Sequence, residues 1–247
     1  MHFRRISKSY VSIFYIFAIK TISTMKINSE LEIYIYEEII PQYSSFDSAH
    51  REDHAMTVIS QAMKLADDME DWKLENNCND EIWKTEIDRN MLFTAAACHD
   101  LGLANGRDRH HLDSGTIIRS DNMLKKWFSE EQIETIAQAA EDHRASGKAQ
   151  PRSIYGMIVA EADRVINGET IIRRTIQFGF NHYPSLTREE HIGRAIGHLR
   201  EKYGRGGYLK LWIPWSDNAA RLEALQDIIA DDIAVREEVE RILKTLE

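Results

Sequence analysis

Cysteine, proline and glycine are all scarce in this chain, and each scarcity excludes a class of protein. Only two cysteines, Cys78 and Cys98, occur among the 247 residues. They exclude a disulfide scaffold and a zinc site of the Cys-x-x-Cys type. Four prolines and twelve glycines exclude collagen-like and linker arrays and most turn-rich all-β folds. Acidic residues outnumber basic residues, which gives a formal net charge of −9. This charge argues against a protein that coats nucleic acid, because such a protein needs a basic surface.

The remaining composition is that of a folded globular protein. Hydrophobic residues make up 43% of the chain and charged residues 29%, which excludes an intrinsically disordered chain. The length corresponds to roughly one to two domains. Because no proline-, glycine- or serine-rich linker and no internal repeat interrupts residues 25–247, we expect a single domain over that range.

Residues 1–24 differ from the rest of the chain. Three basic residues lie within the first eight positions, and an apolar stretch from Tyr10 to Ile19 follows them. That stretch is shorter than the roughly 20 residues that a membrane-spanning helix needs, and no small-residue cleavage site follows it. Three interpretations stay open: an upstream extension with Met25 as the true start, an export signal, or a membrane-associated tail. With Met25 as the start, we expect a cytoplasmic protein without a stable membrane span.

Apolar residues with the spacing of an α-helix recur through residues 25–247, and no sustained strand-like alternation accompanies them. One such stripe runs from Val58 to Met69. Residues typical of helix starts precede other stripes: Asp88, Ser129 with Gln132, Ser153, and Thr187 with Glu190. One or two further helices are expected between Asn218 and Leu246. The sequence therefore predicts an all-α protein.

Histidine is comparatively abundant, with ten in the chain, and several histidines lie where predicted helices approach the core. Each of them alone is more often a helix cap or a salt-bridge partner than a metal ligand. Unpartnered imidazole and carboxylate groups are costly to bury, so a shared metal ion would stabilise several of them together. Nitrogen and oxygen donors without a nearby thiolate suit Mn, Fe, Co or Zn.

Three segments of the sequence carry these residues in a recognisable order. They are HREDHAMTVI with His54, FTAAACHDLGL with His99 and Asp100, and SIYGMIVAEADRV with Asp163. This order resembles the HD superfamily of metal-dependent phosphohydrolases, whose pattern is a histidine, an adjacent His-Asp pair and a distal aspartate. The resemblance implies a single helical HD-domain bundle with a motif core over residues 50–167 and a C-terminal helical extension. It also implies that these four residues are metal ligands.

Family members with two metal ions have additional histidines between the His-Asp pair and the last aspartate. The segments HLDSG, which begins at His111, and AEDHRASG, which contains His143, resemble those steps. The resemblance therefore implies a dinuclear site in which Asp100 bridges two ions and His111 and His143 complete the ligand set. Only 11 positions separate Asp100 from His111, fewer than expected for the bacterial diadenosine-tetraphosphate hydrolases. His110 is therefore an alternative to His111, and a one-metal site stays open.

The resemblance implies hydrolysis of a phosphoester or phosphoanhydride, with a nucleotide as the substrate class and metal-activated water as the nucleophile. Asp100 is expected to be catalytic as the bridging ligand. Arg144 and Lys148, beside His143, are expected to hold phosphate oxygens, although plain exposed charge is an equal alternative for both, as for Arg107 and Arg109. The expected cofactor is a pair of divalent ions, Fe or Mn in the first place and Co, Zn, Ni or Mg as alternatives.

Two further functions stay open at this point. Some HD proteins are di-iron oxygenases that use a similar set of histidines and aspartates, and ligand identity does not separate them from hydrolases. A complete ligand set also suits a non-catalytic nucleotide-binding sensor. Measured turnover of a phosphoester distinguishes a sensor from a hydrolase.

Overall fold

The computed structural model describes residues 27–47, 49–76, 81–144, 149–164 and 166–246. Within these ranges every regular element is a helix and no strand occurs, which confirms the predicted all-α fold class. Residues 1–24 and Lys148 lie outside the described residues. Within the described residues, no helix combines the length and the hydropathy that a membrane span requires.

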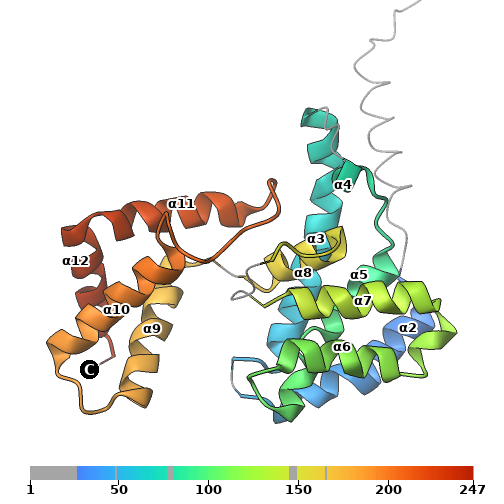
Figure 1. The fold of residues 1–247 in the computed structure, drawn as a ribbon, viewed down its shortest axis with the longest axis horizontal. Helices are drawn as coiled ribbons and strands as arrows, with labels where there is room; N and C mark the ends of the chain where they lie inside the picture. The colour runs from blue at the N-terminus through green and yellow to red at the C-terminus, as the bar shows by residue number, and fades with distance from the viewer. Residues whose placement is uncertain (1–26, 48, 77–80, 145–148, 165, 247) are drawn as a thin grey trace, which may run out of the picture.

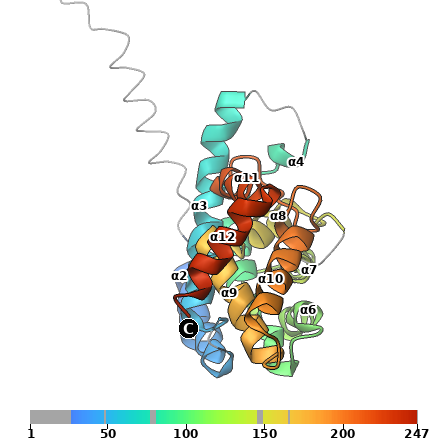
Figure 2. The ribbon, with the colours of Figure 1, turned by 90° about the vertical axis from the view of Figure 1, so that its left-hand side faces the viewer.

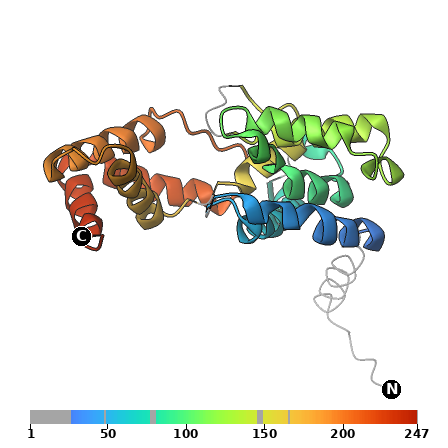
Figure 3. The same cartoon turned by 90° about the horizontal axis from the view of Figure 1, so that it is seen from below.

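The helices form two lobes that lie side by side (Figure 1). The first lobe contains α2 (Ser29–Tyr34), η1 (Ile35–Ile39), η2 (Ile40–Ser45), α3 (Glu52–Asn76), α4 (Glu81–Lys84), α5 (Arg89–Cys98), η3 (Leu101–Asn105), α6 (His110–Ser120), η4 (Leu124–Lys126), α7 (Glu130–Asp142) and α8 (Ile154–Ala162). The second lobe contains α9 (Gly168–His182), α10 (Arg188–Tyr203), α11 (Asp217–Ala230) and α12 (Asp232–Leu243). Figure 2 shows the second lobe in front of the first, and Figure 3 shows both lobes from below.

Side-chain caps determine where several of these helices begin. The carboxylate of Asp88 accepts hydrogen bonds from the first N–H groups of α5, and the hydroxyl of Ser153 does the same for α8. Ser129 and Gln132 form a reciprocal capping box at α7. Such caps satisfy backbone donors that have no partner inside the helix and contribute about 1 kcal/mol each. The predicted starts at these positions are confirmed.

Helix α5 runs through the centre of the first lobe. All of its residues from Met91 to Cys98 are buried, and it packs against α3, α7 and α8. Three of the last four residues of α5 are alanines (AAAC), which lets neighbouring helices approach closely. The helix therefore delivers the residues that follow it, His99 and Asp100, into the interior of the lobe.

The second lobe has a hydrophobic core of its own, separate from that of the first lobe. The segment between α10 and α11 nevertheless returns to the first lobe, where Ile213 is part of the first core. The ring of Trp215 lies 4.9 Å from that of Trp72 and 5.2 Å from that of Trp83, and its Nε1 donates a hydrogen bond of 2.9 Å to the Leu65 carbonyl. Two connections therefore join the lobes: the chain after α8 and this returning segment.

Candidate metal centre

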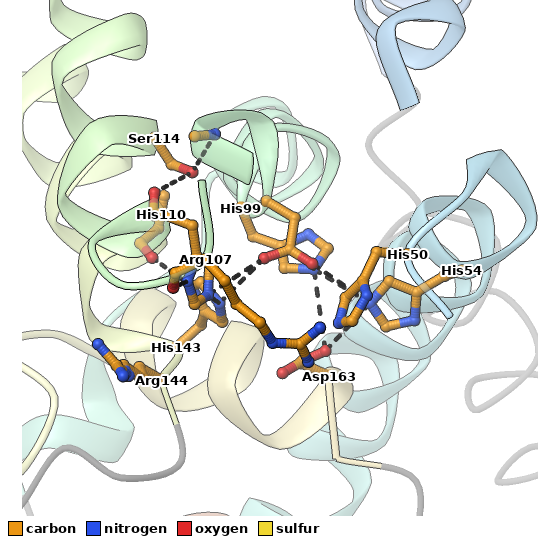
Figure 4. Close-up of polar contacts among 12 residues, drawn as sticks. His50, His54, His99, Arg107, His110, Ser114, His143, Arg144 and Asp163 are labelled. Atoms are coloured by element: carbon orange, nitrogen blue, oxygen red, sulfur yellow. Dashed lines mark hydrogen bonds and ion pairs between the residues drawn. The ribbon is translucent and has the colours of Figure 1, made fainter. Parts of the chain in front are cut away.

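Five helix ends of the first lobe meet at one interior point, where their histidine and aspartate side chains converge (Figure 4). The residues concerned are His54 in the first turn of α3, His99 at the C-cap of α5 with Asp100 after it, His110 at the start of α6, His143 at the C-cap of α7 and Asp163 at the C-cap of α8. His99, Asp100 and His143 are buried.

One group of donor atoms gathers around His54 and His99. Their Nε2 atoms are 3.3 Å apart, and Asp163 Oδ1 lies 3.2 Å from Nε2 of His54 and 3.8 Å from Nε2 of His99. Asp100 Oδ2 lies 3.4 Å from Nε2 of His99 and 3.8 Å from Nε2 of His54. These four side chains surround a space that one metal ion can share.

A second group gathers around His110 and His143, whose Nε2 atoms are also 3.3 Å apart. Asp100 belongs to this group through its other oxygen, because Oδ1 lies 3.3 Å from Nε2 of His143 and 3.5 Å from Nε2 of His110. The donor atoms of His54, His99 and Asp100 lie within 4.8 Å of one another, and so do those of Asp100, His110 and His143. The two oxygens of Asp100 thus face two different pairs of histidines.

The hydrogen bonds of the ring nitrogens show that the site suits cations. Nδ1 of His99 lies 2.8 Å from the Ala96 carbonyl, Nδ1 of His110 lies 2.7 Å from the Arg107 carbonyl, and Nδ1 of His143 is bonded to the Ala140 carbonyl in the same way. A carbonyl only accepts, so each Nδ1 carries the proton. In the neutral rings the Nε2 lone pairs then point toward one another. A bound cation converts this unfavourable arrangement into coordination.

The carboxylate of Asp100 supports the same conclusion. The residue is 2% exposed, and its Oδ1 is buried without a hydrogen-bond partner. Burial alone raises the pKa of Asp100, but the adjacent His99 and His143 outweigh burial and hold this pKa far below its usual range. An ionised, buried oxygen without a partner is costly, and a metal ion at this position removes that cost.

Metal binding at the first group should depend on pH. Burial lowers the pKa of His54 and of His99, but the carboxylates of Asp163 and Asp100 outweigh burial and raise both pKa values above the ordinary value of 6.5. A proton on these imidazoles competes with a metal ion. The affinity for Mn²⁺ should therefore fall as the pH drops below the raised pKa values and increase above them. Calorimetric titration with Mn²⁺ across about pH 5.5 to 8.5 measures this, and an affinity that is constant over that range contradicts it.

The structure brings His110, and not His111, into the cluster, so His110, the alternative named from the sequence, takes the place of His111 in the candidate ligand set. Helix α6 begins at His110, and consecutive helical residues point about 100° apart, so the two rings face different directions. The hydrogen bond to the Arg107 carbonyl orients the His110 ring toward Asp100. His111 has a buried Nδ1 without a partner, and burial, followed by the charge of Arg144, lowers its pKa to about 4.

The guanidinium of Arg144 donates a 2.6 Å hydrogen bond to the carbonyl of Asp108. A different charged group lies at the edge of the site. Arg107 forms an ion pair of 3.2 Å with Asp47, and Asp47 also accepts a 2.8 Å hydrogen bond from Nδ1 of His50. Arg107 and Asp47 line a cavity of about 350 Å³.

Asp47 and His50, at the edge of the site, were not among the residues expected there from the sequence. The only local signal was the position of His50, four residues before His54. In the structure the centroids of the His50 and His54 rings are 5.6 Å apart. Figure 4 shows the two residues next to each other. The ion pair between Asp47 and Arg107 spans 60 positions of the chain, so no local pattern predicts it.

The helical lobe and its cluster of imidazole and carboxylate groups define an α-helical domain with a candidate metal-binding site. Residues 51–168 match the family model described as HD domain, and this range contains all six residues of the cluster. The chain thus contains an HD domain over residues 51–168, which supports a relationship to the HD superfamily of metal-dependent phosphohydrolases. Members of this family are in general metal-dependent hydrolases that bind divalent ions. Searches of curated proteins and of solved structures found no match.

Proposed function

We propose that this protein is a dinuclear metal-dependent phosphohydrolase that acts on a small phosphorylated substrate, with a nucleotide as the substrate class. The observation that carries the proposal is the position of Asp100, whose two oxygens face two separate pairs of histidines. A carboxylate that serves one ion needs only one such pair. The HD domain supports the hydrolytic class of reaction.

The residues divide into two ligand groups. His54, His99 and Asp163 would hold one ion, His110 and His143 would hold the other, and Asp100 would contact both. When bound, two divalent ions lower the pKa of a coordinated water and offset negative charge on phosphoryl oxygens. The donor set of imidazoles and carboxylates favours Fe or Mn over a thiolate-preferring metal.

Hydrogen bonds of the main chain hold Asp100, the proposed bridging residue, in position. The N–H of Asp100 donates a 3.2 Å hydrogen bond to the hydroxyl of Tyr43, and that hydroxyl donates a 2.8 Å bond to the Ala97 carbonyl. Tyr43 is 0% exposed, so water does not compete for these bonds. The position of Asp100 is therefore set before any ion binds, which is the preorganisation that positioned catalytic groups need.

The two ligand groups differ in the number of their donors, which suggests where the substrate binds. The group around His110 and His143 has three protein side chains, whereas the group around His54 has four. The group with fewer protein ligands retains more positions for water and phosphate oxygens. We assign phosphate binding to Arg107, since its side chain is 70% exposed and its own carbonyl orients His110. Arg144, which the sequence also favoured for phosphate binding, donates a hydrogen bond to the Asp108 carbonyl, and its contact with phosphate stays a prediction.

A metal-dependence assay tests the proposed function. Protein purified without oxygen is analysed for metals, stripped with a chelator and reloaded with Mn²⁺ or Fe²⁺. We expect the loaded protein to release phosphate from at least one member of a panel of nucleotides and simple phosphoesters. The chelated protein should not, and added metal should restore activity. Full metal loading without hydrolysis of any phosphoester contradicts the proposal.

A further inference from the structure

The metal-ligand candidate Asp163 lies at a structurally weak position, the C-terminal end of α8. It is the C-cap residue of that helix, and the last carbonyl groups of any helix have no partner inside the helix. Only a short connection separates Asp163 from the start of α9 at Gly168. The position of its carboxylate therefore depends on whatever holds this helix end.

The side chain of Asn218, in the first turn of α11, holds it. Asn218 Nδ2 lies 2.6 Å from the carbonyl oxygen of Arg164 and 3.2 Å from that of Glu161. These carbonyls flank Asp163 on both sides along the chain. Asn218 is 6% exposed, so water does not replace these bonds. One amide from the second lobe thus fixes the backbone around Asp163.

Other buried bonds connect the same two segments. Glu161 is 0% exposed, and its carboxylate accepts hydrogen bonds from Asn218 Nδ2 at 3.1 Å and from the Trp212 N–H at 3.2 Å. The N–H of Ile166 donates to Asn218 Oδ1 at 3.3 Å. Arg164 donates a 2.8 Å bond to the Lys210 carbonyl. Buried polar networks of this kind rigidify the elements that they join.

We propose that Asn218 is a positioning residue for the metal centre, through which the second lobe fixes Asp163 in its ligating position. The inference rests on the proposed metal centre. It predicts that metal binding in the first lobe and the attachment of the second lobe stabilise each other, because coupling between two sites is reciprocal. An ordinary contact between lobes has no such effect on the affinity for metal.

The test uses the full chain and Mn²⁺ alone, with free Mn²⁺ measured by electron paramagnetic resonance. Asn218→Ala removes the side-chain amide that donates to Glu161 and Arg164 and should weaken Mn²⁺ binding about 10- to 100-fold, the range seen when groups that orient a ligand are removed. Asn218→Asp keeps the size and the acceptor for the Ile166 N–H. It loses the donors and brings a second carboxylate to Glu161, so it should weaken binding at least as much.

Gln226→Ala is the matched control. Gln226 also donates its side-chain amide to a backbone carbonyl, that of Tyr203 at 3.1 Å, but within the second lobe. This variant should retain the wild-type affinity for Mn²⁺ even if it unfolds at a lower temperature. Wild-type affinity in Asn218→Ala overturns the inference and leaves the metal centre standing. Failure of the unaltered protein to bind Mn²⁺ overturns the metal centre itself.

Hydrogen exchange on the unaltered protein gives an independent test that does not depend on whether the variants fold. Reciprocal coupling predicts that Mn²⁺ slows exchange of the amide hydrogens of Ile166 and Trp212, which lie in the network. The amide of Tyr183 at the far end of α9 serves as an internal control and should be unaffected. Exchange at Ile166 and Trp212 that is the same with and without bound Mn²⁺ contradicts the inference.

Discussion

Replacing Asp100 with asparagine should lower the rate of phosphoester hydrolysis by at least about 10²-fold. Asparagine retains the size of the side chain and one acceptor oxygen, but it loses the negative charge and the second anionic oxygen. Both oxygens are used here, because Oδ2 faces His99 and Oδ1 faces His143. The substitution should also reduce the amount of bound metal, since one carboxylate contributes to both ligand groups. Steady-state kinetics and elemental analysis of the purified variant measure the two effects.

The fold should survive this substitution. The packing of α5 from Met91 to Cys98 is unchanged, so the circular dichroism spectrum should remain close to that of the unaltered protein. Asp121→Asn is a matched control, because Asp121 also follows a helix of the first lobe and accepts a bond from Tyr34. It should retain activity and metal content. An Asp100→Asn protein with full metal and unchanged turnover would show that the His-Asp pair is not the catalytic centre.

The adjacent histidines His110 and His111 should respond oppositely to replacement by alanine. His110→Ala removes one of the three side chains of the second ligand group and should reduce the metal content from two ions toward one. Turnover should fall by about 10²-fold or more, because the substrate-facing geometry is lost. His111→Ala should leave both ions in place, since this residue lies outside both ligand groups.

The pair provides its own control, because both residues lie in the first turn of α6 and both substitutions remove the same side chain. Metal-to-protein ratios measured in parallel on the two variants show whether His110 or His111 is the ligand. A loss of metal in His111→Ala with full occupancy in His110→Ala would restore the assignment made from the sequence.

Local sequence signals predicted much of the fold. Ser129 with Gln132 and Thr187 with Glu190 form the capping boxes that their spacing predicts, and Asp88 caps α5. These signals are reliable because a cap and its helix lie within a few residues of each other. The choice between His110 and His111 could not be made in this way. It depends on the residue at which α6 begins, and an error of one position turns a side chain by about 100°.

Contacts between distant segments could not be predicted at all. Asn218 and Glu161 are 57 positions apart, and the second hydrophobic core forms only when α9 to α12 pack together. Such pairs result from tertiary packing, which no periodicity or short motif encodes. The resemblance to the HD family nevertheless supplied His54, His99, Asp100, His143 and Asp163, and the structure brings these side chains together. Their role as ligands stays a prediction.

Anomalous diffraction from crystals of the protein loaded with Mn²⁺ tests the central claim most directly. Data collected at an energy above the manganese absorption edge locate the ions independently of any activity. We expect two peaks separated by about 3.5–4 Å, one beside His54, His99 and Asp163 and the other beside His110 and His143, with Asp100 between them. A single peak, or peaks that do not contact Asp100, would contradict the dinuclear centre.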